Sequence, residues 1–265
     1  YSIDQEHLYP KALMGELGRA GAFAAALDAG GRRFALGLDA MRAISRSCGA
    51  TGFLTWAHDV CGMYLEQSGN PALTGRRLQD HMLGRTFGGT ALSNPMKALA
   101  GIEPMQLKAE PVQGGYRVSG ALPWVSHIGQ GQYCGAMATV CKPGGSRWHE
   151  IMFLLDMDEQ VGLRPCPVFS GMEGTSTWAV RLNNYFVGQD LLIADPVQPL
   201  LQRIRAAFVL LQVGIAAGVA QGAIDSILEV EPMLGHVNQF LADRPDVLQA
   251  EYEDLWQRAA RLAQT

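Results

Sequence analysis

The chain lacks the sequence features that would place it in several specialised classes. None of its five cysteines forms a C-x-x-C pair, and an odd number argues against a disulfide framework. A reducing cytoplasm is therefore the expected compartment. The formal net charge is −4, the pI is near 5.9, and no block of basic residues occurs. This balance argues against nucleic acid and anionic membranes as partners.

The common motifs of hydrolases, metalloenzymes and nucleotide-binding proteins are also missing. The six histidines include no H-E-x-x-H pair, and the sequence has neither a G-x-S-x-G elbow nor a P-loop. Residues 129–135 (GQGQYCG) have the spacing G-x-G-x-x-x-G and precede a strand-like run, whereas a dinucleotide loop opens a helix. His58-Asp59 has no further ligand one helical turn away, so we expect no metal site.

One segment is long and apolar enough to raise the question of a membrane span. Residues 206–224 carry no charge over 19 positions, a length that suffices to cross a bilayer. The segment is mostly Ala and Gly, however, and it contains Gln212 and Gln221. We expect a central helix that is buried on all sides, and no membrane. The sequence as given opens at Tyr1 without a basic-then-apolar segment, which fits the same expectation.

Helical periodicity in the first third predicts an N-terminal helical domain over residues 1–85. Apolar residues recur at spacings of three and four, and Gly30-Gly31 is expected to end the first helix. Asn70-Pro71 combines a capping residue with a first-turn proline and predicts a further short helix. The other predicted helices are 5–28, 34–48 and 51–67.

After Gly84 the pattern changes to alternation, which predicts an antiparallel β-domain over residues 86–195. Residues 105–109 and 116–118 alternate in polarity, and Gln113-Gly114-Gly115 between them predicts a hairpin turn. Further predicted strands are 132–141, 151–156 and 178–187.

Helical periodicity returns over residues 196–265 and predicts a C-terminal bundle. Gly214, Gly218 and Gly222 lie four apart, so they share a face that another helix can approach closely. Pro232 and Pro245 are expected to interrupt the helices. The order of helices, strands and helices predicts an α+β fold and not a doubly wound parallel sheet. The bundle looks short by one or two helices.

Three segments in order resemble the acyl-CoA dehydrogenase superfamily of flavoproteins. Residues 88–95 (GGTALSNP) resemble its A-L-T-E-P segment, and residues 118–127 (VSGALPWVSH) resemble its G-x-K-x-W-I-T-N segment. Residues 171–177 (GMEGTST) are similar to its G-x-R-G-(S/T)-x-(S/T) stretch. The resemblance extends over nearly the whole chain and implies a helical domain, a β-domain facing the flavin and a partial helical bundle.

The resemblance implies a flavin cofactor, FAD or alternatively FMN, and assigns residues to it. Residues 91–93 would bind the pyrimidine edge, Trp124 would lie against the ring and Ser126 would reach its N5 side. Such contacts tune how readily the ring accepts a hydride. Taken singly, Trp124 could equally be a core aromatic and Ser93 a turn residue. The full set of implied cofactor-binding residues is Ala91, Leu92, Ser93, Trp124, Val125 and Ser126.

The chain departs from the family pattern at the substrate and at the base. The glycine-serine-aspartate stretch that helps hold acyl-CoA is replaced by residues 96–101 (MKALAG). The R-x-x-F-G segment is absent near residues 231–240. A carboxylate removes the α-proton in acyl-CoA dehydrogenation. The position that carries it in some members falls near Phe208 here, and neither Glu173, Glu229 nor Glu231 is expected to replace it.

Three functions follow as hypotheses. The first is a dehydrogenase that oxidises an acyl-CoA at its α,β-carbons. The second is a monooxygenase that uses reduced flavin and O₂, for which His58 is the candidate catalytic residue, helped by Ser126 and His127. The third is a catalytically silent scaffold. In each case the resemblance implies a homodimer or a homotetramer.

Overall fold

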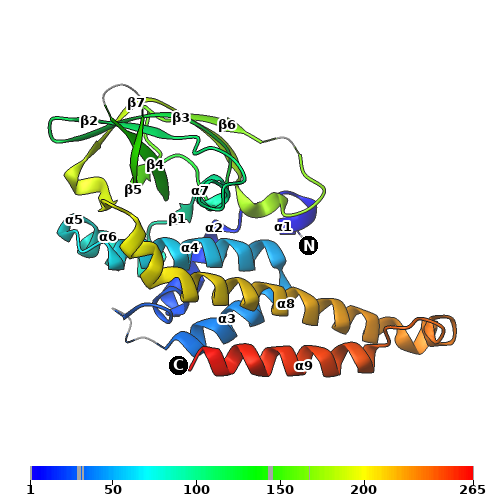
Figure 1. Cartoon of the computed structure of the whole chain (residues 1–265). Coiled ribbons are helices and arrows are strands. Elements are labelled where there is room, and N and C mark those ends of the chain that lie inside the picture. The colour runs from blue at the N-terminus through cyan, green and yellow to red at the C-terminus, as the bar shows by residue number, and fades with distance from the viewer. Residues whose placement is uncertain (1, 29–30, 32, 143–145, 167, 265) are drawn as a thin grey trace.

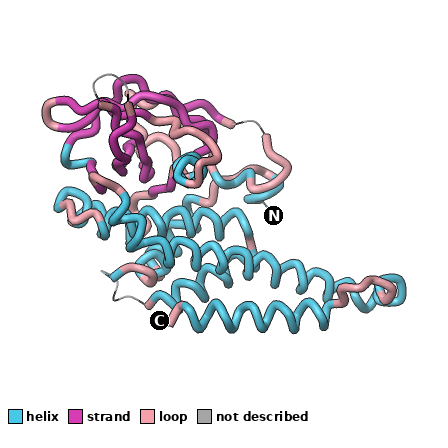
Figure 2. Tube along the Cα trace, viewed as in Figure 1, coloured by secondary structure: helices cyan, strands magenta, loops and turns pink. Residues whose placement is uncertain are grey.

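The computed structural model describes residues 2–28, 31, 33–142, 146–166 and 168–264. A β-domain lies on one side of a layer of helices, and two long helices extend sideways beyond it (Figure 1). Helices and strands separate cleanly into these two parts along the trace (Figure 2). The α+β class predicted from the sequence is confirmed, with helices before and after a central sheet.

The N-terminal part is helical up to Met82, close to the predicted boundary at residue 85. Its central helix is α4, which is buried along almost its whole length. The single helix expected over residues 5–28 is wrong, because the chain turns at Gly21, whose φ of 86° is left-handed. The helices are α1 (Ser2–Gln5), α2 (Lys11–Arg19), the 3₁₀ turn η1 (Ala22–Ala24), α3 (Phe34–Ser47), α4 (Gly49–Gln67), α5 (Pro71–Thr74) and α6 (Arg76–Met82).

The β-domain follows, with a short helix between its first two strands. Its elements are β1 (Gly88–Thr90), α7 (Ser93–Leu99), β2 (Lys108–Val112), β3 (Gly115–Val125), β4 (Tyr133–Cys141), β5 (Arg147–Asp156), β6 (Gly162–Pro165), η3 (Glu173–Thr175), β7 (Trp178–Gly188), η4 (Gln189–Leu191) and β8 (Leu192–Ala194). The expected hairpin turn lies between β2 and β3. The helix α7 and the short strands β1, β6 and β8 were not predicted, because each is too short to show a period.

The sheet is mainly antiparallel, as predicted, and two parallel pairings make it mixed. Its strand order is β6-β7-β3-β2-β4-β5-β8, with β1 beside β4. In the described part of the chain, β4 pairs in parallel with both β1 and β2, and the other pairings are antiparallel. After the β2–β3 hairpin the chain crosses to the other side of β2 and forms β4 there, so β4 runs parallel to β2. One apolar core fills the β-domain, and a second joins α4 and α8 to the sheet.

The C-terminal part consists of α8 (Gln198–Asn238) and α9 (Pro245–Leu262). The expected interruption at Pro232 is wrong, because α8 continues through it. The glycine face of α8 is used within the chain. A Cβ on Gly218 would lie 2.4 Å from the Arg42 carbonyl oxygen of α3, and one on Gly222 would lie 2.6 Å from that of Arg46. The two helices therefore pack at backbone distance.

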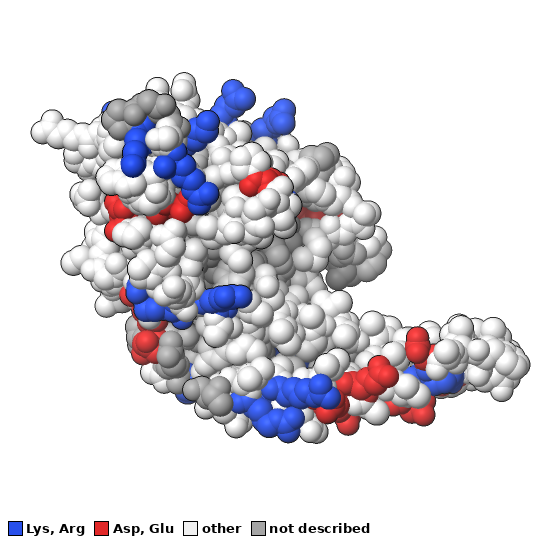
Figure 3. Space-filling model, in the orientation of Figure 1, with Lys and Arg blue, Asp and Glu red and all other residues white. Residues whose placement is uncertain are grey.

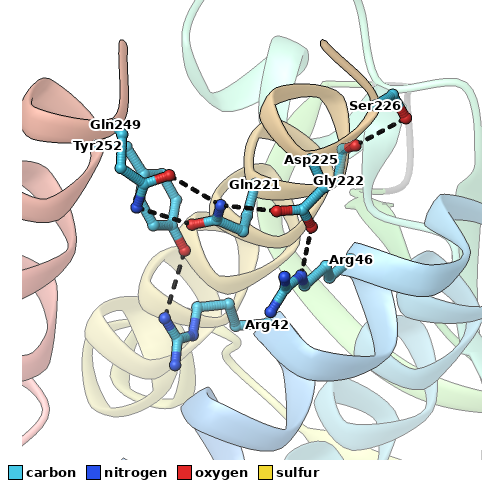
Figure 4. Close-up of polar contacts among 8 residues, drawn as sticks. All are labelled: Arg42, Arg46, Gln221, Gly222, Asp225, Ser226, Gln249 and Tyr252. Atoms are coloured by element: carbon cyan, nitrogen blue, oxygen red, sulfur yellow. Dashed lines mark hydrogen bonds and ion pairs between the residues drawn. The ribbon is translucent and has the colours of Figure 1, made fainter. Parts of the chain in front are cut away.

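Polar contacts join α3, α8 and α9 beside this glycine face (Figure 4). Arg46 Nε donates to Asp225 at 2.5 Å, and the amides of Gln221 and Gln249 bind one another. Arg42 lies over the Trp256 ring at 4.3 Å. These contacts border a polar cavity of about 550 Å³.

The expectation that α8 is buried on all sides is also wrong for this chain. By length and hydropathy α8 could span a membrane, and 28% of its most apolar 18-residue stretch is buried inside the structure. One face packs on α3 and α4, while much of the rest is exposed and rich in valine, leucine and methionine. The long helix is thus a surface helix with an apolar exposed face.

Candidate functional site

A cleft lies where the end of β3 and the start of α7 face α4 and α8. Its main part has a volume of about 440 Å³, and a neighbouring part of about 570 Å³ shares Phe53, Trp124 and Ser126 with it. The main part is lined by Phe53, Trp56, Ala57, Thr90, Leu92, Ser93, Met96, Trp124, Ser126, Phe208 and Gln212. The surface between the β-domain and the projecting helices carries few charged side chains in the view of Figure 3.

The structure brings together the residues that the sequence assigned to a cofactor. Trp124 stands at the end of β3 with 50% of its surface exposed and borders both parts of the cleft, so it is not an ordinary core aromatic. Ser93 begins α7 and is exposed, Ser126 is half-buried, and both line the main part. Leu92 is buried at its wall.

Ala91 and Val125 are near the cleft but turn their side chains elsewhere. Both are buried in the core of the β-domain and border a smaller pocket of about 140 Å³ beside Trp124. Only their backbone groups could face a ligand in the main part. Val125 therefore supports the position of its neighbour Trp124 and offers no side chain of its own.

The glycines of the segment GGTALS explain why the two family-like segments meet. A Cβ on Gly89 would lie 2.5 Å from the carbonyl oxygen of Ser126, and a Cβ on Gly88 would lie 2.4 Å from the Tyr133 ring. A side chain at 89 would push β1 away from the Ser126–His127 backbone, and one at 88 would collide with the Tyr133 ring. The close approach of β1 to Ser126 at the cleft edge thus depends on glycine at 89.

A chain of hydroxyl groups continues the site into the third family-like segment. The hydroxyl oxygens of Ser126 and Thr177 are 2.7 Å apart, and those of Thr177 and Thr175 are 2.9 Å apart. Thr175 and Thr177 line the neighbouring part of the cleft. The hydroxyl of Ser126 is therefore held in place by the segment 171–177.

Aromatic side chains form the opposite wall. The rings of Phe53 and Trp56 on α4 lie 5.4 Å apart, and Phe208 of α8 meets Trp56 edge-on at 5.2 Å. The indole N–H of Trp56 donates to the carbonyl of Phe208 at 3.3 Å. Phe208, the position expected for a base in some family members, thus contributes an apolar face.

Among the described residues that line either part of the cleft, none carries a carboxylate. Glu173 lies in η3 beside His7, Glu229 borders the cavity between α3, α8 and α9, and Glu231 pairs with Arg244. That none of these three glutamates replaces the base stays a prediction.

His58, the candidate for monooxygenase catalysis, does not line the cleft. Its side chain is 0% exposed and stacks on His81 with ring centroids 3.6 Å apart. The backbone N–H of Gly88 donates to its Nδ1 at 3.3 Å, so the proton resides on Nε2, which donates to the carbonyl of His81 at 3.0 Å. A direct catalytic role for His58 is therefore not supported.

The histidine cluster behind β1 also includes His127 and two tyrosines. The Tyr9 hydroxyl donates to His127 Nδ1 at 3.1 Å, and His127 Nε2 lies 3.4 Å from His58 Nδ1. His81 Nε2 donates to the carbonyl of His58, and His81 Nδ1 accepts from the Tyr133 hydroxyl at 2.9 Å. Each nitrogen has one role, and all three rings are neutral.

Burial accounts for this neutrality. Desolvation lowers the pKa of His127 to about 3 and that of His81 to about 4. Desolvation, reinforced by His81 and His127, lowers the pKa of His58 well below its usual value. The cluster holds the His127 side chain in place. The His127 backbone N–H donates to the Thr175 carbonyl at 2.9 Å, so His127 links the cluster to the segment 171–177 beside the cleft.

Comparisons with known proteins agree on the architecture. A glutaryl-coenzyme A dehydrogenase in complex with glutaryl-CoA superposes with a TM-score of 0.82 at 18% identity, over 98% of this chain and 70% of that one. The 3-HSA hydroxylase from Rhodococcus sp. RHA1 gives 0.71 at 17% identity, over 98% and 69%. The chain has the acyl-CoA dehydrogenase fold.

A sequence relative points the same way, although no family model matches the chain. The mitochondrial isovaleryl-CoA dehydrogenase of Oryza sativa is 27% identical over 165 residues, which are 59% of this chain. The match spans 38% of the length of the rice protein. The resemblance predicted from the three segments is thus confirmed at the level of the fold.

Within this fold the cleft residues suit a flavin ring. A half-exposed indole offers a large flat apolar surface, and the neighbouring hydroxyls of Ser93 and Ser126 can reach polar edge atoms of a ring lying on it. The wall of Phe53, Trp56 and Phe208 can cover the other face. Ionised groups, which would oppose burial of such a ring, do not line the described part of the main cleft.

Proposed function

We propose that the chain is a flavin-dependent oxidoreductase with FAD, or alternatively FMN, lying against Trp124. The observation that carries the proposal is the exposed indole at the end of β3, facing a cleft whose other wall is aromatic and uncharged. A flavin bound there would supply hydride acceptance at N5. The chain's own contribution is to orient the ring through Trp124, Ser93 and Ser126 and to exclude water with Phe53 and Phe208.

The substrate that we propose is an acyl-CoA, oxidised at its α,β-carbons. The likeness in fold to glutaryl-coenzyme A dehydrogenase and the sequence similarity to the rice isovaleryl-CoA dehydrogenase support this reaction. Phe53, Trp56 and Met96 give the cleft an apolar side suited to an acyl chain. The reaction also needs a base, and we propose that it comes from outside the described residues that line the cleft.

The purified protein tests the proposal directly. Bound flavin should give a visible absorption spectrum. When FAD is titrated with flavin-free protein, its fluorescence should be quenched until the FAD is saturated. Isovaleryl-CoA and glutaryl-CoA, added under argon, should bleach the flavin if the protein is a dehydrogenase. A colourless protein that does not bind FAD or FMN would favour the scaffold hypothesis.

The second candidate function is a monooxygenase that uses reduced flavin and O₂. The lack of a carboxylate among the described cleft residues favours it, since this chemistry does not need the dehydrogenation base. The fold likeness to the 3-HSA hydroxylase is consistent with it. Here reduced FAD supplied to the protein should consume O₂ faster than free reduced FAD does, and acyl-CoA should leave the bound flavin oxidised.

A further inference from the structure

Two hydroxyl groups that the proposed function does not use meet at the cleft wall. Tyr64 is fully buried on the side of α4 that faces the β-domain, and its hydroxyl oxygen lies 2.8 Å from Thr90 Oγ1. Thr90 ends β1, is half-buried and lines the main part of the cleft. The pair therefore connects the buried interior with the cleft.

The surroundings decide which hydroxyl is the donor. In the part of the chain that the structure describes, the Tyr64 hydroxyl has Thr90 as its hydrogen-bond partner and no other. If Thr90 donated, the Tyr64 proton would be buried without an acceptor, which is costly. Tyr64 must therefore donate to Thr90. The proton of Thr90 is then free, and the open side of Thr90 is the cleft.

The backbone holds both members of the pair in place. Thr90 lies opposite Gly135 in the parallel β1–β4 ladder, and the next N–H, that of Ala91, donates to the Gly135 carbonyl at 2.9 Å. A Cβ on Gly135 would lie 2.3 Å from Cδ2 of Tyr64. The Tyr64 ring thus lies directly on the glycine of the neighbouring strand, so its hydroxyl has little freedom to move away.

We propose that Thr90 donates a hydrogen bond to a carbonyl oxygen of the molecule bound in the cleft, and that Tyr64 is the positioning residue for this donor. The inference rests on the proposed function, because it takes a flavin and an acyl thioester as the ligands. Both carry carbonyl acceptors, on the pyrimidine ring and at the thioester. Thr90 lines the main part of the cleft together with Leu92 and the aromatic residues Phe53 and Trp56 of α4, so its hydroxyl is available to a ligand there.

The test compares Thr90→Val, which removes the hydroxyl at nearly constant shape, with Thr90→Ser, which keeps it. Loss of one hydrogen bond should raise a dissociation constant roughly 2- to 12-fold. Thr90→Ser should remain within about twofold of wild type. If Thr90→Val weakens only the binding of FAD, the acceptor is the flavin carbonyl. If it weakens only the binding of isovaleryl-CoA to the FAD-loaded protein, the acceptor is the thioester carbonyl. Unchanged values in both titrations would overturn the inference.

Tyr64→Phe separates positioning from a merely structural role. It should weaken the same titration as Thr90→Val, by a smaller factor, and should have no further effect in the Thr90→Val background. Independent, additive effects would show that Tyr64 does not act through Thr90. Thr139→Val, a buried Thr on β4 outside the cleft, is the matched control and should bind both ligands as wild type does.

The two proposals can fail separately. A wild-type protein that binds no flavin would overturn the proposed function and this inference with it. A wild-type protein that binds flavin, together with a Thr90→Val variant that matches it with both ligands, would overturn this inference alone.

Discussion

Among single residues, Trp124 is the one whose substitution tests flavin binding in the cleft most directly. We expect Trp124→Ala to weaken flavin binding and to shift the visible spectrum, because aromatic packing contributes about 0.5–1.5 kcal/mol beyond the buried area. This corresponds to at least a roughly 2- to 12-fold rise in the dissociation constant. Trp148→Ala is the control, since Trp148 is exposed on β5 away from the cleft. Equal affinity in both variants would contradict the position assigned to the ring.

The neutral histidines predict a dependence of stability on pH. In the folded protein burial lowers the pKa of His81 to about 4 and that of His127 to about 3, against about 6.5 when unfolded. The unfolded state therefore binds more protons below pH 6.5, so the stability from these groups is complete above pH 6.5. It is lost as pH falls towards 4, by up to about 1.4 kcal/mol per pH unit for each histidine.

Urea unfolding between pH 4 and 7.5 checks this prediction. His81→Gln should make the dependence shallower by up to about 1.4 kcal/mol per pH unit relative to wild type. Buried Asp59, whose pKa burial raises, has the opposite effect above its usual pKa, but it is common to both proteins and cancels in the comparison. His236→Gln, at an exposed position near the end of α8, should leave the slope unchanged. Parallel curves for wild type and His81→Gln would refute the neutral cluster.

At the level of elements, the contact between α3 and α8 rests on glycine. A Cβ at Gly218 would lie 2.4 Å from a backbone oxygen and 2.5 Å from the Cβ of Ser45. We expect Gly218→Ala to lower the free energy of unfolding by about 1–3 kcal/mol or more, as overpacking does. Gly235 in the same helix meets only the carboxylate end of Glu231, which can shift without moving the backbone, so Gly235→Ala should change the free energy of unfolding by less than about 1 kcal/mol. Similar values for the two variants would be inconsistent with the packing.

The aromatic wall also depends on how two helices pack, because it joins α4 to α8. Trp56 contacts Phe208 through its ring and through its indole N–H. The period of the sequence placed both residues on helices, but it could not show that they face each other. That pairing depends on the close approach of α8 to α3, which also brings α8 to the cleft.

For the whole molecule, the exposed apolar surface of α8 supports the predicted homodimer or homotetramer. The glycine face of α8 packs on α3 within the chain, so the exposed apolar residues of α8 lie on its other faces. Met233 and Val237 are one turn apart near the C-terminal end of α8, and both are largely exposed. The helix α8 extends sideways beyond the β-domain (Figure 1). A face of this kind is typical of an interface between proteins.

Sedimentation velocity at micromolar concentration checks this assembly. We expect the wild type to sediment as a dimer or a tetramer, and Met233→Glu combined with Val237→Glu to shift it towards the monomer, because two charges would have to be buried. Gln257→Glu at an exposed position of α9 should leave the assembly unchanged. A monomeric wild type would count against the prediction.

The sequence by itself determined the order of helices, strands and helices, because the apolar period changes near Gly84 and again near Pro196. It also identified the segments around Ser93, Trp124 and Thr175, since their residue types and intervals resemble a known family. The spacing of Gly214, Gly218 and Gly222 showed that a helix would approach there. These features are local, so neighbouring residues suffice to reveal them.

Tertiary structure alone decided what each of these residues faces. It exposed Trp124 to the cleft and buried His58 in a cluster of histidines away from the cleft. It also brought the hydroxyl of Tyr64 on α4 to Thr90 of β1. It also made the sheet mixed by pairing β4 with β1 and β2 in parallel. Such contacts join residues far apart in the chain, and they depend on the close approach that Gly88, Gly89 and Gly135 permit. Periodicity cannot reveal them, because it reports which face of an element is apolar and not which partner that face meets.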